Sequence, residues 1–156
     1  ILAADYKHMA MLKFVGDVRV LMSSTLDNYS QSLYRRGMLD AMVVDLSETK
    51  GIDSTALGLL AKLAIQLRNR FNVTPTIVSP NPDITHILRS MNFDVIFKIV
   101  DTYVSGTTHY QEINQQQESE DTVREKVLDA HLTLMTLSEE NRLEFHDLVQ
   151  SLKKQS

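Results

Sequence analysis

Residues 43–60, VVDLSETKGIDSTALGLL, join an apolar run to the start of a helix through a polar stretch. The apolar run AMVVDL (residues 41–46) is short and nearly continuous, as expected for a strand covered on both faces. Residues 55–71 predict the strongest helix of the chain. Its core-facing stripe consists of Leu57, Leu60, Ala64, Leu67 and Phe71. The acidic and hydroxyl side chains of residues 53–55 therefore fall at the point where a strand delivers them to a helix start.

The remaining elements extend this strand and helix order in both directions. The expected elements are a β-hairpin over residues 9–22 that turns at Gly16-Asp17, a helix over 23–37 with Ser and Thr caps, a strand over 72–79, a helix after Pro82 and a strand over 95–100. Strands that alternate with helices favour parallel pairing, because parallel neighbours need a crossover that is usually a helix. The predicted fold class is α/β, with a mixed, mostly parallel sheet and helices packed against it.

The amino-acid composition of the chain changes after Asp101. Residues 105–121 are polar and glutamine-rich, and predict a last short helix that runs into a linker. Helical periodicity returns from Thr122, and Ser138 with two following acids predicts the start of a second helix. We therefore expect a domain over residues 1–117 and a helical extension, a helical hairpin, over 118–156. The extension either packs on the domain and stabilises it, or provides a dimer interface or a docking site for a second partner.

Composition argues against several classes of protein. The net charge is −4 and the basic residues are scattered, which disfavours a nucleic-acid partner. There is no cysteine, no apolar run approaching the roughly 20 residues that cross a bilayer, and no signal segment, so we expect a cytoplasmic protein without a membrane partner. The five histidines lie far apart, which disfavours a metal site, and the five glycines form no phosphate-binding loop, so no cofactor is expected.

Catalysis has little support in the sequence. No GxSxG turn surrounds a serine, and no pair of carboxylates suggests acid and base roles, so we expect a non-enzymatic protein with no catalytic residue. One alternative is a receiver-like phospho-relay module, in which Asp45 at the end of a strand accepts the phosphoryl group. A receiver would also need an acidic pair after its first strand and a lysine after a late strand. Neither appears in that context here.

The hydroxyl of Ser54 has a simple structural explanation. Serine is among the best N-cap residues, and a cap contributes roughly 1 kcal/mol. A cap does not explain the neighbouring Asp53 and Thr55, or the small Ala56 and Gly58. The small residues predict an unobstructed surface on which another protein could reach the hydroxyl.

The segment GIDSTALGLL resembles the signature of the STAS domain family, the domain of sulfate transporters and anti-sigma factor antagonists. The matching residues are Ile52, Asp53, Ser54, Thr55, Ala56, Leu57 and Gly58, preceded by VVDLS. The resemblance continues through residues 73–99, and covers about two thirds of the chain. It departs from the family at Ala56, where many members have Gly, and in the tail from Glu118, which the simple family domain lacks.

In the bacterial antagonist branch, the resemblance implies that Ser54 is phosphorylated by a partner kinase and restored by a PP2C-type phosphatase. The resemblance also suggests Thr55 as a secondary acceptor. The expected partner-binding residues are Asp53, Ser54, Thr55, Ala56, Gly58 and Leu59. The implied partners are an anti-sigma factor or a serine kinase of the switch type. The resemblance places the protein in a partner-switching pathway, a form of signal transduction that regulates transcription. A further alternative is a small-ligand sensor or the cytosolic part of a transporter.

Overall fold

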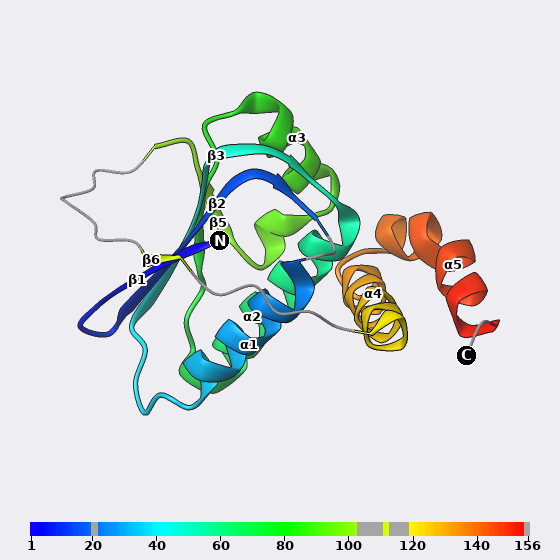
Figure 1. The fold of residues 1–156 in the computed structure, drawn as a ribbon. Helices are drawn as coiled ribbons and strands as arrows, with labels where there is room; N and C mark the ends of the chain where they lie inside the picture. The colour runs from blue at the N-terminus through cyan, green and yellow to red at the C-terminus, as the bar shows by residue number, and fades with distance from the viewer. Residues whose placement is uncertain (20–21, 103–110, 113–118, 155–156) are drawn as a thin grey trace.

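The computed structural model describes residues 1–19, 22–102, 111–112 and 119–154. Its centre is a six-stranded sheet of order β5-β4-β3-β2-β1-β6 (Figure 1). The strands are β1 (Leu2–Tyr6), β2 (Met9–Val18), β3 (Ala41–Ile52), β4 (Thr76–Val78), β5 (Lys98–Val100) and β6 (Gln111–Glu112). The pairs β2–β3, β3–β4 and β4–β5 are parallel, whereas β1 pairs antiparallel with both β2 and β6. The predicted fold class, a mixed and mostly parallel sheet with packed helices, is confirmed.

The helices of the α/β part lie on one side of the sheet in the view of Figure 1. They are α1 (Ser23–Tyr34), α2 (Ser54–Phe71) and α3 (Pro82–Ser90), and a short 3-10 helix covers Phe93–Val95. Alternate residues of β3 reflect this arrangement, because Val44 is buried while Val43 on the opposite face is half-buried. The expectation that this strand is covered on both faces therefore holds for the face of Val44 and only in part for the face of Val43.

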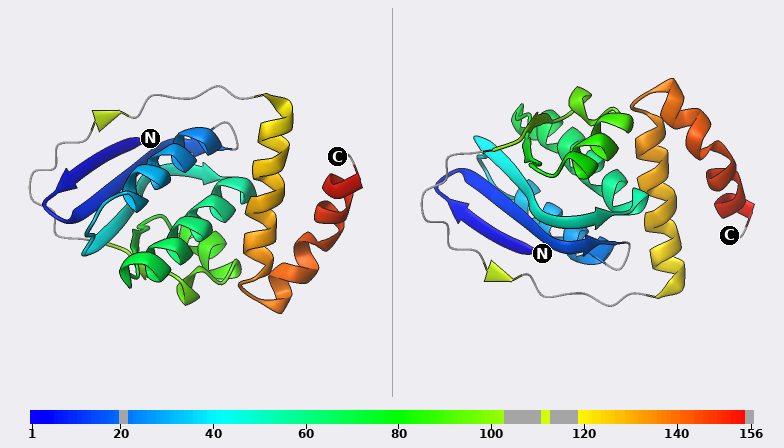
Figure 2. Two further views of the ribbon diagram at one scale, coloured as in Figure 1. Left: turned by 90° about the horizontal axis from the view of Figure 1, so that it is seen from below. Right: turned by 90° about the horizontal axis from the view of Figure 1, so that it is seen from above.

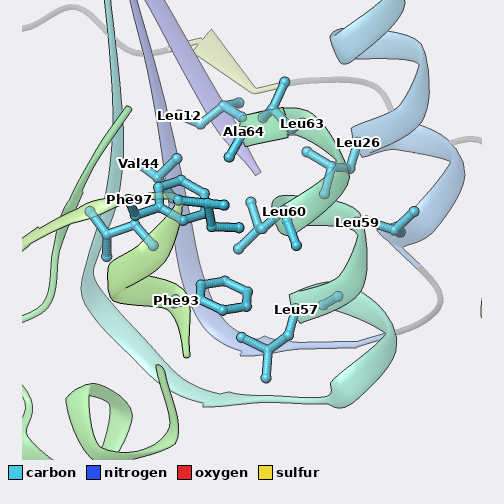
Figure 3. Close-up of a cluster of buried hydrophobic side chains, with 14 of the residues drawn as sticks. Leu12, Leu26, Val44, Leu57, Leu59, Leu60, Leu63, Ala64, Phe93 and Phe97 are labelled. Atoms are coloured by element: carbon cyan, nitrogen blue, oxygen red, sulfur yellow. The ribbon is translucent and has the colours of Figure 1, made fainter. Parts of the chain in front are cut away.

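Helix α2 supplies the centre of the hydrophobic core. Its predicted stripe is buried at Leu57, Leu60, Ala64 and Leu67, and half-buried at Phe71. Figure 3 shows Leu57, Leu60 and Ala64 directed toward the strands and toward Phe93 and Phe97. The apolar periodicity of residues 55–71 thus predicts both the helix and its inward face.

The two ends of the first hairpin differ from the prediction. The chain turns at residues 7–8, between β1 and β2, and Lys7 takes the positive φ of 54°. Gly16 instead lies inside β2, with φ of 80°, beside shifts in the β2–β3 register. A glycine in this conformation is typical of a β-bulge. The expected turn at Gly16-Asp17 is therefore wrong.

Strand β3 is longer than its apolar run. The polar stretch of residues 47–51, which was not predicted to be part of the strand, continues it beside the end of β2 as far as Ile52. Helix α1 begins after Met22 without a side-chain cap, so the expected Ser and Thr caps are also wrong. The long β3 therefore brings its last residue directly to the start of α2.

Two helices follow the sheet, and no described helix of this chain is long and apolar enough to cross a membrane. They are α4 (Glu120–Met135) and α5 (Glu139–Lys154), as the periodicity of the tail predicts. The predicted cap is confirmed, because the backbone N–H of Asn141 donates to Ser138 Oγ at 3.0 Å. The short helix expected within residues 105–121 is replaced at residues 111–112 by β6, and the rest of that prediction lies largely outside the described residues.

Candidate functional site

The start of α2 is capped by Asp53, not by Ser54. The Asp53 Oδ1 atom accepts the backbone N–H of Ala56 at 2.8 Å, and the Asp53 N–H donates to the Val18 carbonyl at 2.9 Å. Ser54 is the first residue of the helix. The expectation that Ser54 caps the helix is wrong, and its hydroxyl is available for another contact.

That contact is made with a histidine of α4. Ser54 Oγ lies 2.7 Å from His131 Nε2, and His131 Nδ1 lies 2.7 Å from the Val127 carbonyl oxygen. Because a carbonyl oxygen only accepts, Nδ1 carries a proton, and in the neutral ring Nε2 is then an acceptor. The Ser54 hydroxyl therefore donates to Nε2. His131 itself is 1% exposed, and Ser54 is half-buried.

Helix α4 also covers Gly58, one turn along α2. A Cβ atom added at Gly58 would lie 2.6 Å from the Ala130 Cβ and would also collide with the Ala130 carbonyl group. Only glycine permits such a close approach of the two helices. The expected unobstructed surface around the small residues is therefore wrong, because the chain's own extension occupies it.

The other predicted site residues lie mostly beneath the surface. Thr55 is 6% exposed, and Ala56 and Leu59 are also buried. In Figure 3 Leu59 extends from α2 on the side of α1. Asp53 and Ser54, which are half-buried, are the members of the set with the most accessible surface. All six residues thus lie at the cap or in the first two turns of α2. Asp53 and Ser54 are the ones with side chains most accessible to a partner.

Ion pairs connect α4 to α2 and to α1. Lys62 Nζ lies 2.7 Å from Asp129 Oδ2, which joins α2 to α4. Lys126 Nζ lies 3.4 Å from Asp27 Oδ2, which joins α4 to α1. These pairs are partly exposed, so each contributes at most about 1 kcal/mol. They orient α4 over α2 without supplying most of the packing energy.

The connection between α4 and α5 is fastened to the α/β part by asparagines. The buried Asn141 donates from Nδ2 to the carbonyl oxygens of Met91 and Leu134, each at 2.9 Å. Asn92 donates from Nδ2 to Ser138 Oγ at 2.9 Å. Figure 2 shows the resulting arrangement, with α4 against the α/β part and α5 on its outer side.

A ring contact links α5 to the serine. Phe145 of α5 packs edge-on against His131, with centroids 5.0 Å apart and an interplanar angle of 72°. His131 and Asn141 were both missed by sequence reasoning as site residues. A signal for His131 exists, because it falls three residues before Leu134 and four after Val127, within the apolar stripe of its helix. Asn141 carries no comparable signal.

Asp45 does not occupy the position that a receiver-like module requires. It lies within β3, seven residues before the strand ends, and is 1% exposed. Its Oδ1 atom accepts the backbone N–H of Ser47 at 2.8 Å. The premise that Asp45 ends a strand is wrong, and the receiver-like alternative loses its support.

A hollow of about 690 Å³ lies where β4 and β5 meet the start of α3. Its lining includes Thr85, His86, Arg89 and Asp101, but none of the predicted partner-binding residues. Within residues 1–19, 22–102, 111–112 and 119–154, no group of three or more His, Asp and Glu side chains is placed to hold a metal ion. The chemistry at Ser54 is therefore separate from this hollow.

Comparisons with known proteins agree with this geometry. The STAS domain model matches residues 2–106, which is more than half of the chain. Among solved structures, a predicted anti-sigma factor antagonist from Thermotoga maritima is similar, with a TM-score of 0.57 and 21% identity over 64% of this chain and 85% of that one. At this identity the likeness concerns the fold. No curated protein matches the chain. With the mostly parallel sheet and the DST segment at the start of α2, these matches show that the chain belongs to the STAS domain family.

Proposed function

We propose that this chain is a phosphorylation-regulated binding protein of the anti-sigma factor antagonist type. In its unphosphorylated form it binds an anti-sigma factor or a serine kinase of the switch type. A kinase transfers the γ-phosphoryl group of ATP to Ser54 Oγ, with release of ADP and a proton. A PP2C-type phosphatase then hydrolyses the ester with water, which restores serine and releases phosphate. The protein acts in bacterial cytoplasm and has no catalytic role of its own.

The observation that carries this proposal is the division of roles between Asp53 and Ser54. Asp53 satisfies the start of α2, so Ser54 Oγ can be modified without loss of the helix cap. A phosphate there also lies at a helix N-terminus, where the free N–H groups and the helix dipole favour negative charge. The domain should therefore tolerate the modification.

The effect on a partner follows from charge. Phosphoserine carries about −1.5 to −2 charges at neutral pH. Placed beside the Asp53 carboxylate, it would repel an acidic partner and would have to lose water before entering any interface. One covalent event can thus switch binding off. Thr55 is a weaker candidate acceptor, because its side chain is buried.

The test compares full-length tagged Ser54→Ala and Ser54→Asp chains as baits in an extract of the source organism, with quantitative mass spectrometry. We expect the alanine form to retain an anti-sigma factor or serine kinase that the aspartate form loses. Ser47→Asp is a matched control, because Ser47 is exposed and gains the same charge outside α2. Equal recovery of every protein by the two Ser54 variants would overturn the switch.

The chemical identity of the phosphate supplies a second readout. Radiolabelled ATP added to the same extract should give the wild-type chain an acid-stable label, because phosphoserine survives acid whereas an aspartyl phosphate is lost. The label should be absent from Ser54→Ala. A dimer interface in the extension stays a prediction, which sedimentation of the full chain would check.

A further inference from the structure

The extension covers the same face of α2 on which the proposed switch depends. Ser54, Gly58 and Lys62 are spaced by four residues, so they form one row along α2. Their partners in α4 are His131, Ala130 and Asp129, three consecutive residues of a single turn. One turn of α4 therefore crosses the row that contains Ser54. Figures 1 and 2 show α4 beside the α/β part.

We infer that α4 and α5 form an intramolecular cap over Ser54, and that this cap and a phosphate on Ser54 exclude one another. The inference rests on the proposed phosphorylation of Ser54, and adds to it a structural response within the same chain. In the closed form, the cap competes with any partner or kinase that approaches the row. In the phosphorylated form, the cap is released.

The hydrogen bond at the crossing depends on the serine proton. The Val127 carbonyl holds the Nδ1 proton of His131, so the neutral ring offers only a lone pair to Ser54. A phosphate dianion has acceptor oxygens and no proton to donate. The modification therefore replaces a favourable contact with two facing acceptors.

The crossing also lacks room for the phosphate. Ser54 Oγ already lies 2.7 Å from Nε2, and phosphorylation adds a phosphorus atom and three oxygens to that atom. His131 is 1% exposed and packs edge-on against Phe145, so its ring is enclosed by other protein atoms. The cation of the row, Lys62, lies two helical turns from Ser54 and is paired with Asp129. Displacement of α4 relieves both the charge and the crowding.

Release has consequences for binding on both surfaces. A partner that needs the row binds the unphosphorylated chain with an apparent affinity lowered by the fraction of open molecules. Release by phosphate exposes the inner face of α4, where Ala130 and Leu134 are otherwise fully buried. The open unphosphorylated form thus presents the row on α2. The phosphorylated form presents the inner face of α4, while the charge of the phosphate blocks the row.

Hydrogen–deuterium exchange of the full chain tests this inference without a kinase or partner. Phosphoserine is encoded genetically at position 54, and exchange is followed in peptides of α2, α4 and α5. We expect exchange in α4 and α5 to rise at least tenfold, while β3 and β4 stay protected. Phosphoserine at the exposed Ser47 is the matched control and should leave α4 unchanged.

A second variant opens the cap without touching α2. Ala130→Arg places a large charged side chain against Gly58 and should raise exchange in α4 to a similar level, whereas Leu132→Arg, at an exposed site of the same helix, should not. Unchanged or slower exchange of α4 in the phosphoserine 54 chain would overturn the inference, including the case in which a protonated His131 binds the phosphate. Such a result would leave the partner comparison of the Ser54 variants intact, so the two proposals fail separately.

Discussion

Replacing Gly58 with alanine tests whether α4 is seated on α2 in solution. In a helix interior, alanine is favoured over glycine by about 1 kcal/mol, so α2 alone should become more stable. The added methyl group would lie 2.6 Å from the Ala130 Cβ, where two helix backbones meet, and α4 must move. Overpacking of this kind typically costs about 1–3 kcal/mol. The free energy of unfolding of the whole chain should therefore fall by between about 0 and 2 kcal/mol.

The two contributions act on different helices and can be measured separately. The cost of about 1–3 kcal/mol falls on the α4 seat, and each 1.4 kcal/mol is a factor of about ten in an equilibrium. Exchange of α4 amides should thus accelerate by about five- to 150-fold by hydrogen–deuterium exchange, while the amides of α2 are protected as well as before. Urea denaturation of the same samples gives the change in the free energy of unfolding of the whole chain.

Gly37→Ala is the matched control for this substitution. A Cβ atom at Gly37 meets nothing within 4 Å, so the same change should leave α4 exchange unaltered. The reasoning is refuted if Gly58→Ala stabilises the chain by the full helix-propensity gain and α4 exchanges as in the wild type. That outcome would mean that Ala130 is not packed on Gly58 in solution.

Two further predictions concern buried polar groups. Asn141→Ala removes donors from the carbonyl oxygens of Met91 and Leu134, and should lower the free energy of unfolding by about 2 kcal/mol in urea titrations; Arg142→Ala, at an exposed neighbour, should have a much smaller effect. Burial raises the pKa of Tyr34 to about 12 from 10.0, so the unfolded chain loses this proton first and stability falls as pH rises from about 10 toward 12. The fall between about pH 10 and 12 should be shallower in Tyr34→Phe, and an identical fall would contradict the assignment.

The elements with strong local patterns were the ones that the sequence could predict. Residues 55–71 combine apolar side chains at helical spacing with a polar start, and α2 follows that pattern closely. Strand β3 was predicted only over its apolar part, because the polar residues 47–51 are strand for a tertiary reason, their pairing with the end of β2. The turn at Lys7 and His8 carries no glycine or proline, whereas Gly16 does carry a turn signal but serves a bulge.

The candidate site divides in the same way. The position of Ser54 at the start of a helix follows from the local sequence and from the resemblance to the STAS family. Its partner His131 is 77 residues away, and no local pattern states that α4 crosses α2 at Gly58. The small residues Ala56 and Gly58 were expected to leave an open surface, whereas Gly58 instead allows α4 to pack closely on α2, and that packing is a tertiary contact that no local pattern predicts.

The contacts of the extension with the row of Ser54, Gly58 and Lys62 come from residues 129–131, while the serine itself lies in the first turn of α2. Under the proposed cap, substitutions in this one turn of α4 would change how readily a phosphate at Ser54 releases the extension, with no substitution in the domain that contains Ser54. Related chains with identical DST segments would then differ in how readily phosphorylation releases α4. Paralogues that differ in residues 129–131 should then differ in how much α4 and α5 are released at a given level of phosphorylation of Ser54.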